Sequence, residues 1–95
     1  GLSSKPYLLG KYNLLYLDDD EGNRTVFEAL FMRDYQVYLA ETPDQALDLL
    51  RTGNVDVFLT DHRMPGELGT EFLARIRPEF PDLPTMILTA YADVD

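Results

Sequence analysis

The chain has 95 residues, enough for one domain, and its 17 acidic against 8 basic side chains give a net charge of −9. This charge argues against a surface for nucleic acid or for an anionic membrane, and the absence of cysteine excludes disulfides and thiolate metal sites. A single histidine disfavours a histidine-based zinc site, and no apolar stretch approaches the roughly 18 residues of a membrane span, so a cytoplasmic location is the default expectation.

The first predicted elements are a tail, a strand and a helix. Residues 1–11 are predicted to form an N-terminal tail, whose apolar side chains could dock on the domain through Tyr7, Leu8 and Leu9. Residues 12–17 form a nearly continuous apolar run, which is typical of a strand buried on both faces. Residues 23–35 are predicted to be helical because their apolar side chains recur at helical spacing, at Val26, Phe27, Leu30 and Phe31.

A second strand and a second helix follow. Residues 36–41 are predicted to form a short strand. Thr42 is suited to cap a helix, Pro43 to occupy its first position and Gln45 its third, which is a capping-box pattern. Gly53 is predicted to end this helix.

The second half of the chain continues the alternation. A strand over 55–60, a helix over 69–77 and a strand over 85–88 are predicted, and residues 91–95 could begin another helix. The resulting β-α-β-α-β-α-β order predicts an α/β fold, a doubly wound parallel sheet with helices on both faces.

Acidic side chains follow the first and third predicted strands. Asp18 and Asp19 come after the first strand, and Asp61 comes after the third. If the strand order is 2-1-3-4, these two strands are neighbours, and ligands of such a sheet bind at the carboxyl ends of the strands where the winding reverses. Thr89, which follows the fourth strand, would then lie beside Asp61 on its other side.

Carboxylates gathered in this way repel one another unless a cation lies among them. Mg²⁺ usually takes one or two carboxylates and keeps several waters, so Asp19 and Asp61 could bind it directly and Asp18 through water. A backbone carbonyl in the turn after Asp61 could add a ligand. Asp61 could then act as a nucleophile toward a phosphoryl group, and the Thr89 hydroxyl could donate a hydrogen bond to a phosphoryl oxygen.

Each candidate residue also has a simpler interpretation when it is taken alone. Asp20 and Glu21 stand where acidic side chains interact favourably with a helix dipole. Asp61 could cap a loop, and His62 and Arg63 are of types that usually lie at the surface. Only the joint pattern of acids and a hydroxyl at successive strand ends favours a site.

Three segments resemble the receiver domain of two-component response regulators. They are Leu14-Leu15-Tyr16-Leu17-Asp18-Asp19-Asp20-Glu21, Asp61-His62-Arg63-Met64-Pro65-Gly66 with Gly69, and Ile87-Leu88-Thr89-Ala90. The likeness covers residues 12–95, which would form the receiver domain with flavodoxin-like topology. It implies that Asp61 is the phosphoacceptor, that Asp18, Asp19 and the backbone carbonyl of Arg63 hold Mg²⁺ together with Asp61, and that Thr89 is the switch hydroxyl.

The resemblance also implies a function and partners. The phosphoryl group would come from a sensor histidine kinase, and the domain would catalyse only its own phosphorylation and dephosphorylation, as a switch rather than a turnover enzyme. An output domain would lie C-terminal in the parent protein. The segments around Asp61 and Thr89 look like those of receivers joined to AAA+ transcription activators or to HD-type cyclic-dinucleotide phosphodiesterases.

The receiver family fold has five strands and five helices, so the resemblance implies that the fifth strand, the last two helices and a phosphoryl-binding lysine are missing here. We therefore expect the fourth strand to be an open edge, which could pair with another copy in a homodimer or a strand-swapped assembly. Without that lysine, phosphorylation of Asp61 is expected to be weak and Mg²⁺ binding better preserved.

Two alternatives remain open at this stage. A haloacid-dehalogenase-like phosphatase would use Asp18 and Asp20 after its first strand, although Gly22 stands where that family has Thr or Val. A degenerate receiver would serve only for docking or dimerisation, although its set of acids and hydroxyl is intact.

Overall fold

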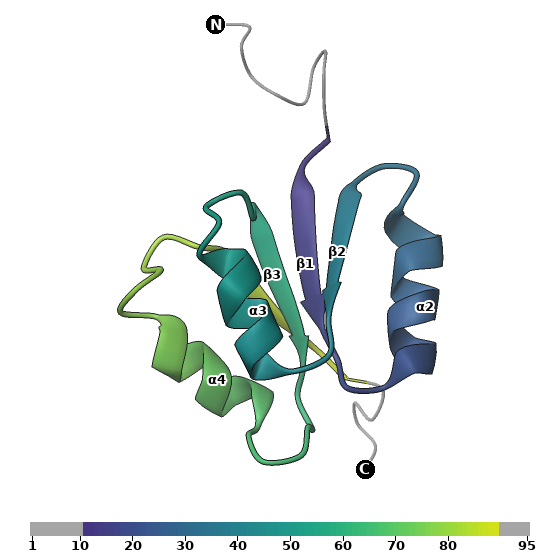
Figure 1. Ribbon diagram of the computed structural model, residues 1–95. Coiled ribbons are helices and arrows are strands. Elements are labelled where there is room, and N and C mark those ends of the chain that lie inside the picture. The colour runs from purple at the N-terminus through teal and green to yellow at the C-terminus, as the bar shows by residue number, and fades with distance from the viewer. Residues whose placement is uncertain (1–10, 90–95) are drawn as a thin grey trace, which may run out of the picture.

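The computed structural model describes residues 11–89, so the expectations for Tyr7, Leu8 and Leu9 and for a helix in 91–95 lie outside the described part. Within it, strands and helices alternate as predicted (Figure 1). The elements are β1 (Asn13–Leu17), α2 (Glu21–Phe31), β2 (Gln36–Ala40), α3 (Pro43–Leu50), β3 (Val57–Asp61), α4 (Gly69–Ile76) and β4 (Thr85–Leu88). No helix in residues 11–89 has the length and apolar character needed to cross a membrane.

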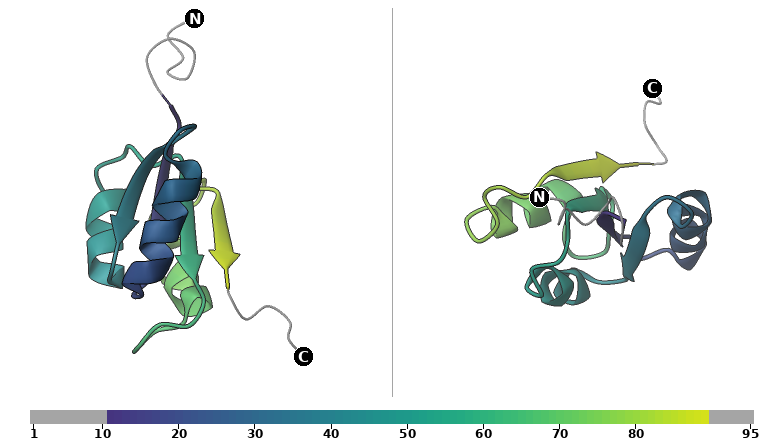
Figure 2. Two further views of the ribbon diagram at one scale, coloured as in Figure 1. Left: turned by 90° about the vertical axis from the view of Figure 1, so that its right-hand side faces the viewer. Right: turned by 90° about the horizontal axis from the view of Figure 1, so that it is seen from above.

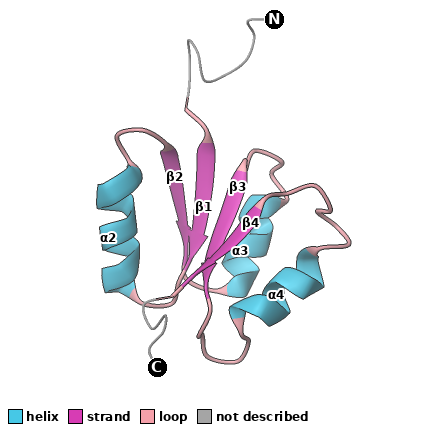
Figure 3. Ribbon diagram, turned by 180° about the vertical axis from the view of Figure 1, so that it is seen from behind, coloured by secondary structure: helices cyan, strands magenta, loops and turns pink. Residues whose placement is uncertain are grey.

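The strands form one parallel sheet in the order β2-β1-β3-β4, which confirms the predicted doubly wound topology (Figure 3). Helix α2 covers one face of this sheet, and α3 and α4 cover the other (Figure 2). In the register of the sheet, Leu17 of β1 is paired with Thr60 of β3, and Asp61 is paired with Leu88 of β4. The carboxyl ends of these strands therefore meet at one edge, as the sequence predicts.

The buried apolar cluster beneath α3 and α4 is larger than the cluster beneath α2. On the α3 and α4 side, Phe58 of the sheet and Phe72 of α4 are fully buried and meet edge to face, with ring centroids 5.8 Å apart. On the α2 side the buried cluster is smaller and consists of Leu14, Tyr16, Phe27 and Leu59. Burial of large aromatic rings supplies much of the apolar area removed from water in so small a domain.

Helix α2 differs from the prediction in its bounds and in its buried face. It begins at Glu21 because the Asp20 side chain caps it, accepting a hydrogen bond from the backbone N–H of Asn23 at 2.9 Å. Phe27 is buried, whereas Val26 and Leu30 are 57% and 66% exposed. The predicted apolar stripe is therefore only partly buried, because α2 packs against β1 and β2, and no helix of residues 11–89 covers β3 and β4 on this face (Figure 2).

The start of α3 is close to the prediction. Thr42 is the N-cap, its hydroxyl accepts from the backbone N–H of Gln45 at 3.1 Å, and Pro43 is the first helical residue. The Gln45 side chain, however, accepts from the backbone N–H of Glu41 at 2.8 Å, one residue earlier than in a standard capping box. The third strand also runs later than predicted, so that Asp61 is its last residue.

Candidate functional site

Three carboxylates converge where β1 and β3 end. One carboxylate oxygen from each of Asp18, Asp19 and Asp61 lies within 4.8 Å of the others. Asp18 follows β1 directly and Asp61 ends β3, so the parallel pairing of these neighbouring strands places their side chains together. Asp18 is 1% exposed and Asp61 9% exposed, whereas Asp19 lies in solvent.

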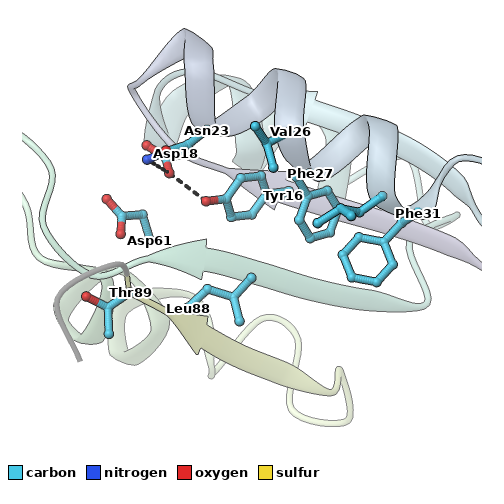
Figure 4. Close-up of a pocket in the computed structure, with 10 residues that line it drawn as sticks. Tyr16, Asp18, Asn23, Val26, Phe27, Phe31, Asp61, Leu88 and Thr89 are labelled. Atoms are coloured by element: carbon cyan, nitrogen blue, oxygen red, sulfur yellow. Dashed lines mark hydrogen bonds between the residues drawn. The ribbon is translucent and has the colours of Figure 1, made fainter. Parts of the chain in front are cut away.

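Asp18 is fixed in place by several hydrogen bonds. Its Oδ2 accepts from the Tyr16 hydroxyl at 2.5 Å and from the Asn23 side-chain amide at 2.9 Å, both drawn in Figure 4. Its Oδ1 accepts from the backbone N–H of Asp20 at 2.9 Å, and its backbone carbonyl accepts from Arg24 at 2.8 Å. The first turn of α2 and the end of β1 therefore orient this carboxylate jointly.

The pKa of Asp61 is raised both by burial and by neighbouring negative charge. Burial raises the pKa of its carboxyl above the ordinary value, and the neighbouring Asp18 carboxylate and, more weakly, that of Asp19 raise it further. A hydrogen bond from the backbone N–H of His62 lowers the pKa of Asp61 and offsets part of this effect. Repulsion between the carboxylates therefore destabilises the fully ionised cluster when no cation is bound.

The donor set suits a hard divalent cation. All three side chains offer carboxylate oxygen, which Mg²⁺ and Ca²⁺ prefer, and residues 11–89 contain no thiolate. A cation between these groups would relieve the repulsion that raises the pKa of Asp61. The cluster could therefore bind a metal ion.

The other predicted site residues lie nearby with different exposure. Thr89 follows β4 and lines the same pocket as Asp18 and Asp61. Figure 4 draws all three side chains. Arg63 lies in the turn after β3 with an exposed side chain. His62 is half-buried rather than at the surface, and its Nδ1 is buried without a hydrogen-bond partner among the described residues.

The turn after β3 explains why two positions in the receiver-like segment that follows Asp61 are glycine. Gly66 has a φ of +86°, in the left-handed region that favours glycine. Gly69 begins α4, and its backbone N–H donates to the carbonyl of His62 at 2.7 Å. A Cβ at Gly69 would collide with the backbone carbonyl oxygen of Asp61, so this glycine permits close packing of α4 against the candidate site.

Tyr16, Asn23 and Arg24 were not predicted as parts of the site. A signal for Tyr16 was present in the sequence, because residues two apart in a strand point to the same face and Tyr16 stands two residues before Asp18. Burial, followed by the hydrogen bond to Asp18, raises the pKa of Tyr16 far above its ordinary value. Its hydroxyl therefore stays protonated and acts as a donor at physiological pH.

A family model for the response regulator receiver domain matches residues 14–95, and the strand order and acidic edge described above agree with it. The chain belongs to the response regulator receiver domain family. This membership confirms the resemblance and removes support from the phosphatase alternative. The geometry agrees, because Asp20 caps α2 and is not among the clustered carboxylates of the described residues.

Three proteins illustrate what this receiver domain is similar to. It is 40% identical over 80 residues to the DNA-binding transcriptional regulator NtrC of Klebsiella pneumoniae, a match that covers 83% of this chain and 17% of NtrC. It is 34% identical to the cyclic di-GMP phosphodiesterase response regulator RpfG of Xanthomonas campestris pv. campestris, over 85% of this chain and 23% of RpfG. The chain thus spans less than a quarter of either relative.

The third protein is the response regulator TrrA of Thermotoga maritima, solved in complex with Mg²⁺ and BeF. The TM-score is 0.77 at 32% identity, and the match covers 85% of this chain and 71% of TrrA. TrrA in its complex with the histidine kinase ThkA matches with a TM-score of 0.76 over 86% of this chain and 72% of TrrA. The flavodoxin-like receiver topology is therefore shown by the fold itself and by its structural relatives.

Proposed function

We propose that this receiver domain is a phosphorylation-dependent switch of a two-component system, with Asp61 as the phosphoacceptor. The observation that supports this most directly is the convergence of Asp18, Asp19 and Asp61 at the strand ends, within 4.8 Å of one another. Family membership supports the same role.

Mg²⁺ is the proposed cofactor, held by the side chains of Asp18, Asp19 and Asp61 and by the backbone carbonyl of Arg63. When bound, it supplies positive charge that neutralises the cluster and the oxygens of the phosphoryl group. TrrA, crystallised with Mg²⁺ and BeF, supports this choice of metal.

The proposed chemistry of the chain itself is nucleophilic. An ionised Asp61 oxygen attacks phosphorus, so that an O–P bond forms as the P–N bond to a phosphohistidine breaks. The Thr89 hydroxyl donates a hydrogen bond to a phosphoryl oxygen. Movement of Thr89 toward that oxygen would shift a two-state equilibrium of the loops at this edge.

The proposed phosphoryl donor is a sensor histidine kinase, which the complex of TrrA with ThkA supports. Similarity to NtrC and RpfG supports an output domain C-terminal in the parent protein, with transcription regulation as the first candidate output. We place the protein in the cytoplasm, without direct nucleic acid contact by the receiver itself, and we retain a homodimer or strand-swapped assembly as a proposal for the β4 edge.

The test is covalent labelling of this chain by acetyl phosphate in the presence of Mg²⁺, followed by intact-mass spectrometry. We expect a low yield of one added phosphoryl group, which disappears in Asp61→Asn. The matched control is Asp82→Asn, which removes an exposed acid outside the cluster and should keep the label. Label that survives Asp61→Asn but is lost in Asp18→Asn would contradict the proposal and favour the phosphatase chemistry.

A docking-only receiver would give a different result. It would take no label and would gain no stability from Mg²⁺. Absence of label in the wild-type chain, together with Mg²⁺ binding that Asp61→Asn abolishes, would contradict phosphoryl transfer to Asp61 and leave only the proposed metal site.

A further inference from the structure

Asp18 is the most constrained carboxylate of the acidic cluster. It is 1% exposed, and its Oδ2 accepts hydrogen bonds from two side chains, the Tyr16 hydroxyl at 2.5 Å and the Asn23 amide at 2.9 Å. A carboxylate oxygen has two lone-pair directions, so these two donors occupy both of them. Among residues 11–89, Oδ1 accepts from the backbone N–H of Asp20 alone, which leaves one of its directions open.

The consequence is that Asp18 can offer at most one oxygen position to a cation or to a water bound by it. Bidentate ligation would require Oδ2 to give up Tyr16 or Asn23. Ca²⁺ takes six to eight oxygens and often binds carboxylates through both, whereas Mg²⁺ binds through one or two carboxylates and keeps its waters. A carboxylate held in this way is better matched to Mg²⁺.

Tyr16 is itself held rigidly enough to act on Asp18. It is 6% exposed, and its ring stacks on Phe27 with centroids 4.3 Å apart and planes inclined by 15° (Figure 4). The hydroxyl oxygen could move away from Asp18 only if the whole ring moved, which would disturb this buried stack. Asn23 is held from the other side, because its backbone N–H is bound by the cap of α2.

We propose that Tyr16 and Asn23 are positioning residues that restrict Asp18 to a single open oxygen and thereby make the site selective for Mg²⁺ over Ca²⁺. The proposal rests on the proposed metal site. It goes beyond that site by assigning metal selectivity to two residues that do not themselves touch the metal.

The experiment measures the Kd of Mg²⁺ and of Ca²⁺ separately by isothermal titration calorimetry on the wild-type chain, Tyr16→Phe and Asn23→Ala. We expect Ca²⁺ affinity to rise relative to Mg²⁺ affinity by about tenfold in each variant, the scale of one hydrogen bond to a charged acceptor. The ratio of the two Kd values is the readout, because a merely structural role would weaken both metals alike.

Tyr38→Phe is the matched control, since it removes a hydroxyl from an exposed tyrosine of β2 outside the pocket that Asp18 and Asp61 line, and its Kd ratio should equal that of the wild type. Asn23 is exposed on the first turn of α2, so Asn23→Ala should fold even where Tyr16→Phe does not. Thermal unfolding without metal verifies that each variant is folded.

The outcomes separate this inference from the proposed function. Wild-type protein that binds neither metal would overturn the metal site and the inference together. Metal binding that requires Asp61, with a Kd ratio unchanged in both Tyr16→Phe and Asn23→Ala, would overturn the inference alone. A ratio that shifts in both variants and not in Tyr38→Phe would support it.

Discussion

At the scale of single residues, Asp18 and Asp61 have opposite surroundings although they share one pocket. Asp18 is satisfied by donors from Tyr16, Asn23 and the backbone of Asp20. Burial raises the pKa of Asp61, as do the Asp18 and Asp19 carboxylates. Asp18 is thus fixed by hydrogen bonds, whereas the pKa of Asp61 is raised by the negative charge of the cluster.

We therefore expect Asp61→Asn to stabilise the metal-free domain at neutral pH. Coulomb's law gives about 1 kcal/mol of repulsion between unit charges 4 Å apart, even at the dielectric constant of water, and this repulsion disappears with the Asp61 charge. Thermal unfolding in a chelating buffer measures the gain. Asp82→Asn is the control, because an equal gain there would assign the effect to net charge rather than to the cluster.

The sign of the pH dependence follows from the raised pKa of Asp61 in the folded state. The folded chain binds the Asp61 proton more tightly than the unfolded chain, whose pKa is near the ordinary value of 3.8. The contribution of Asp61 to stability is therefore fully present below pH 3.8 and is lost as pH rises through the folded pKa. The advantage of Asp61→Asn should vanish in acid, and an advantage that persists at pH 3 would contradict this account.

At the scale of elements, the sequence predicted the existence of each strand and helix better than its ends. The start of α3 was predictable because Thr strongly favours the N-cap and Pro the first helical position, which are the positions of Thr42 and Pro43. The start of α2 was not, since Asp20 was interpreted as an acid near a helix dipole although its side chain is the N-cap itself. The exposure of Val26 and Leu30 depends on which strands α2 covers, and helical spacing carries no information about that.

In the candidate site, too, some residues were predictable from the sequence and others were not. Asp18, Asp19 and Asp61 were predictable because the carboxyl ends of neighbouring parallel strands meet. Tyr16 and Asn23 were not predicted, since a tyrosine within an apolar strand is usually a core residue, and an asparagine in a first helical turn usually lies in solvent. The two-residue spacing places Tyr16 and Asp18 on the same strand face, but only side-chain geometry reveals that Tyr16 and Asn23 reach the same oxygen of Asp18.

The packing of α4 against β3 gives an element-scale prediction. Gly69→Ala would place a Cβ against the backbone carbonyl oxygen of Asp61, so α4 or the end of β3 must move. We expect a loss of about 1–3 kcal/mol in the free energy of unfolding, the usual cost of overpacking, together with weaker metal binding. Urea unfolding measures the first effect and calorimetry the second.

Thr70→Ala is the control for Gly69→Ala, because it changes the next, exposed position of α4 without approaching Asp61. Unchanged stability in Gly69→Ala would mean that the turn after β3 relaxes at little cost. The close approach of α4 would then not be what positions Asp61.

At the scale of the whole molecule, the net charge of −9 means that any cation stabilises the fold to some extent by screening. A specific metal site must therefore be separated from this general effect. Specific binding follows mass action and saturates, whereas screening depends on ionic strength and not on the identity of the cation.

We expect Mg²⁺ to raise the melting temperature more than NaCl does at equal ionic strength. At a Mg²⁺ concentration of 100 times Kd, binding to the folded state alone adds about 2.7 kcal/mol. Each kcal/mol raises the Tm of a domain this small by roughly 4–8 °C, so the difference is measurable by differential scanning calorimetry. Asp61→Asn should abolish the additional stabilisation by Mg²⁺ and keep the response to NaCl. The reason is that screening acts on all the surface charges, whereas specific binding requires Asp61. Equal responses to the two salts in the wild-type chain would mean that the acidic edge acts only as part of the overall charge, and the domain would then be a docking module rather than a metal-dependent switch.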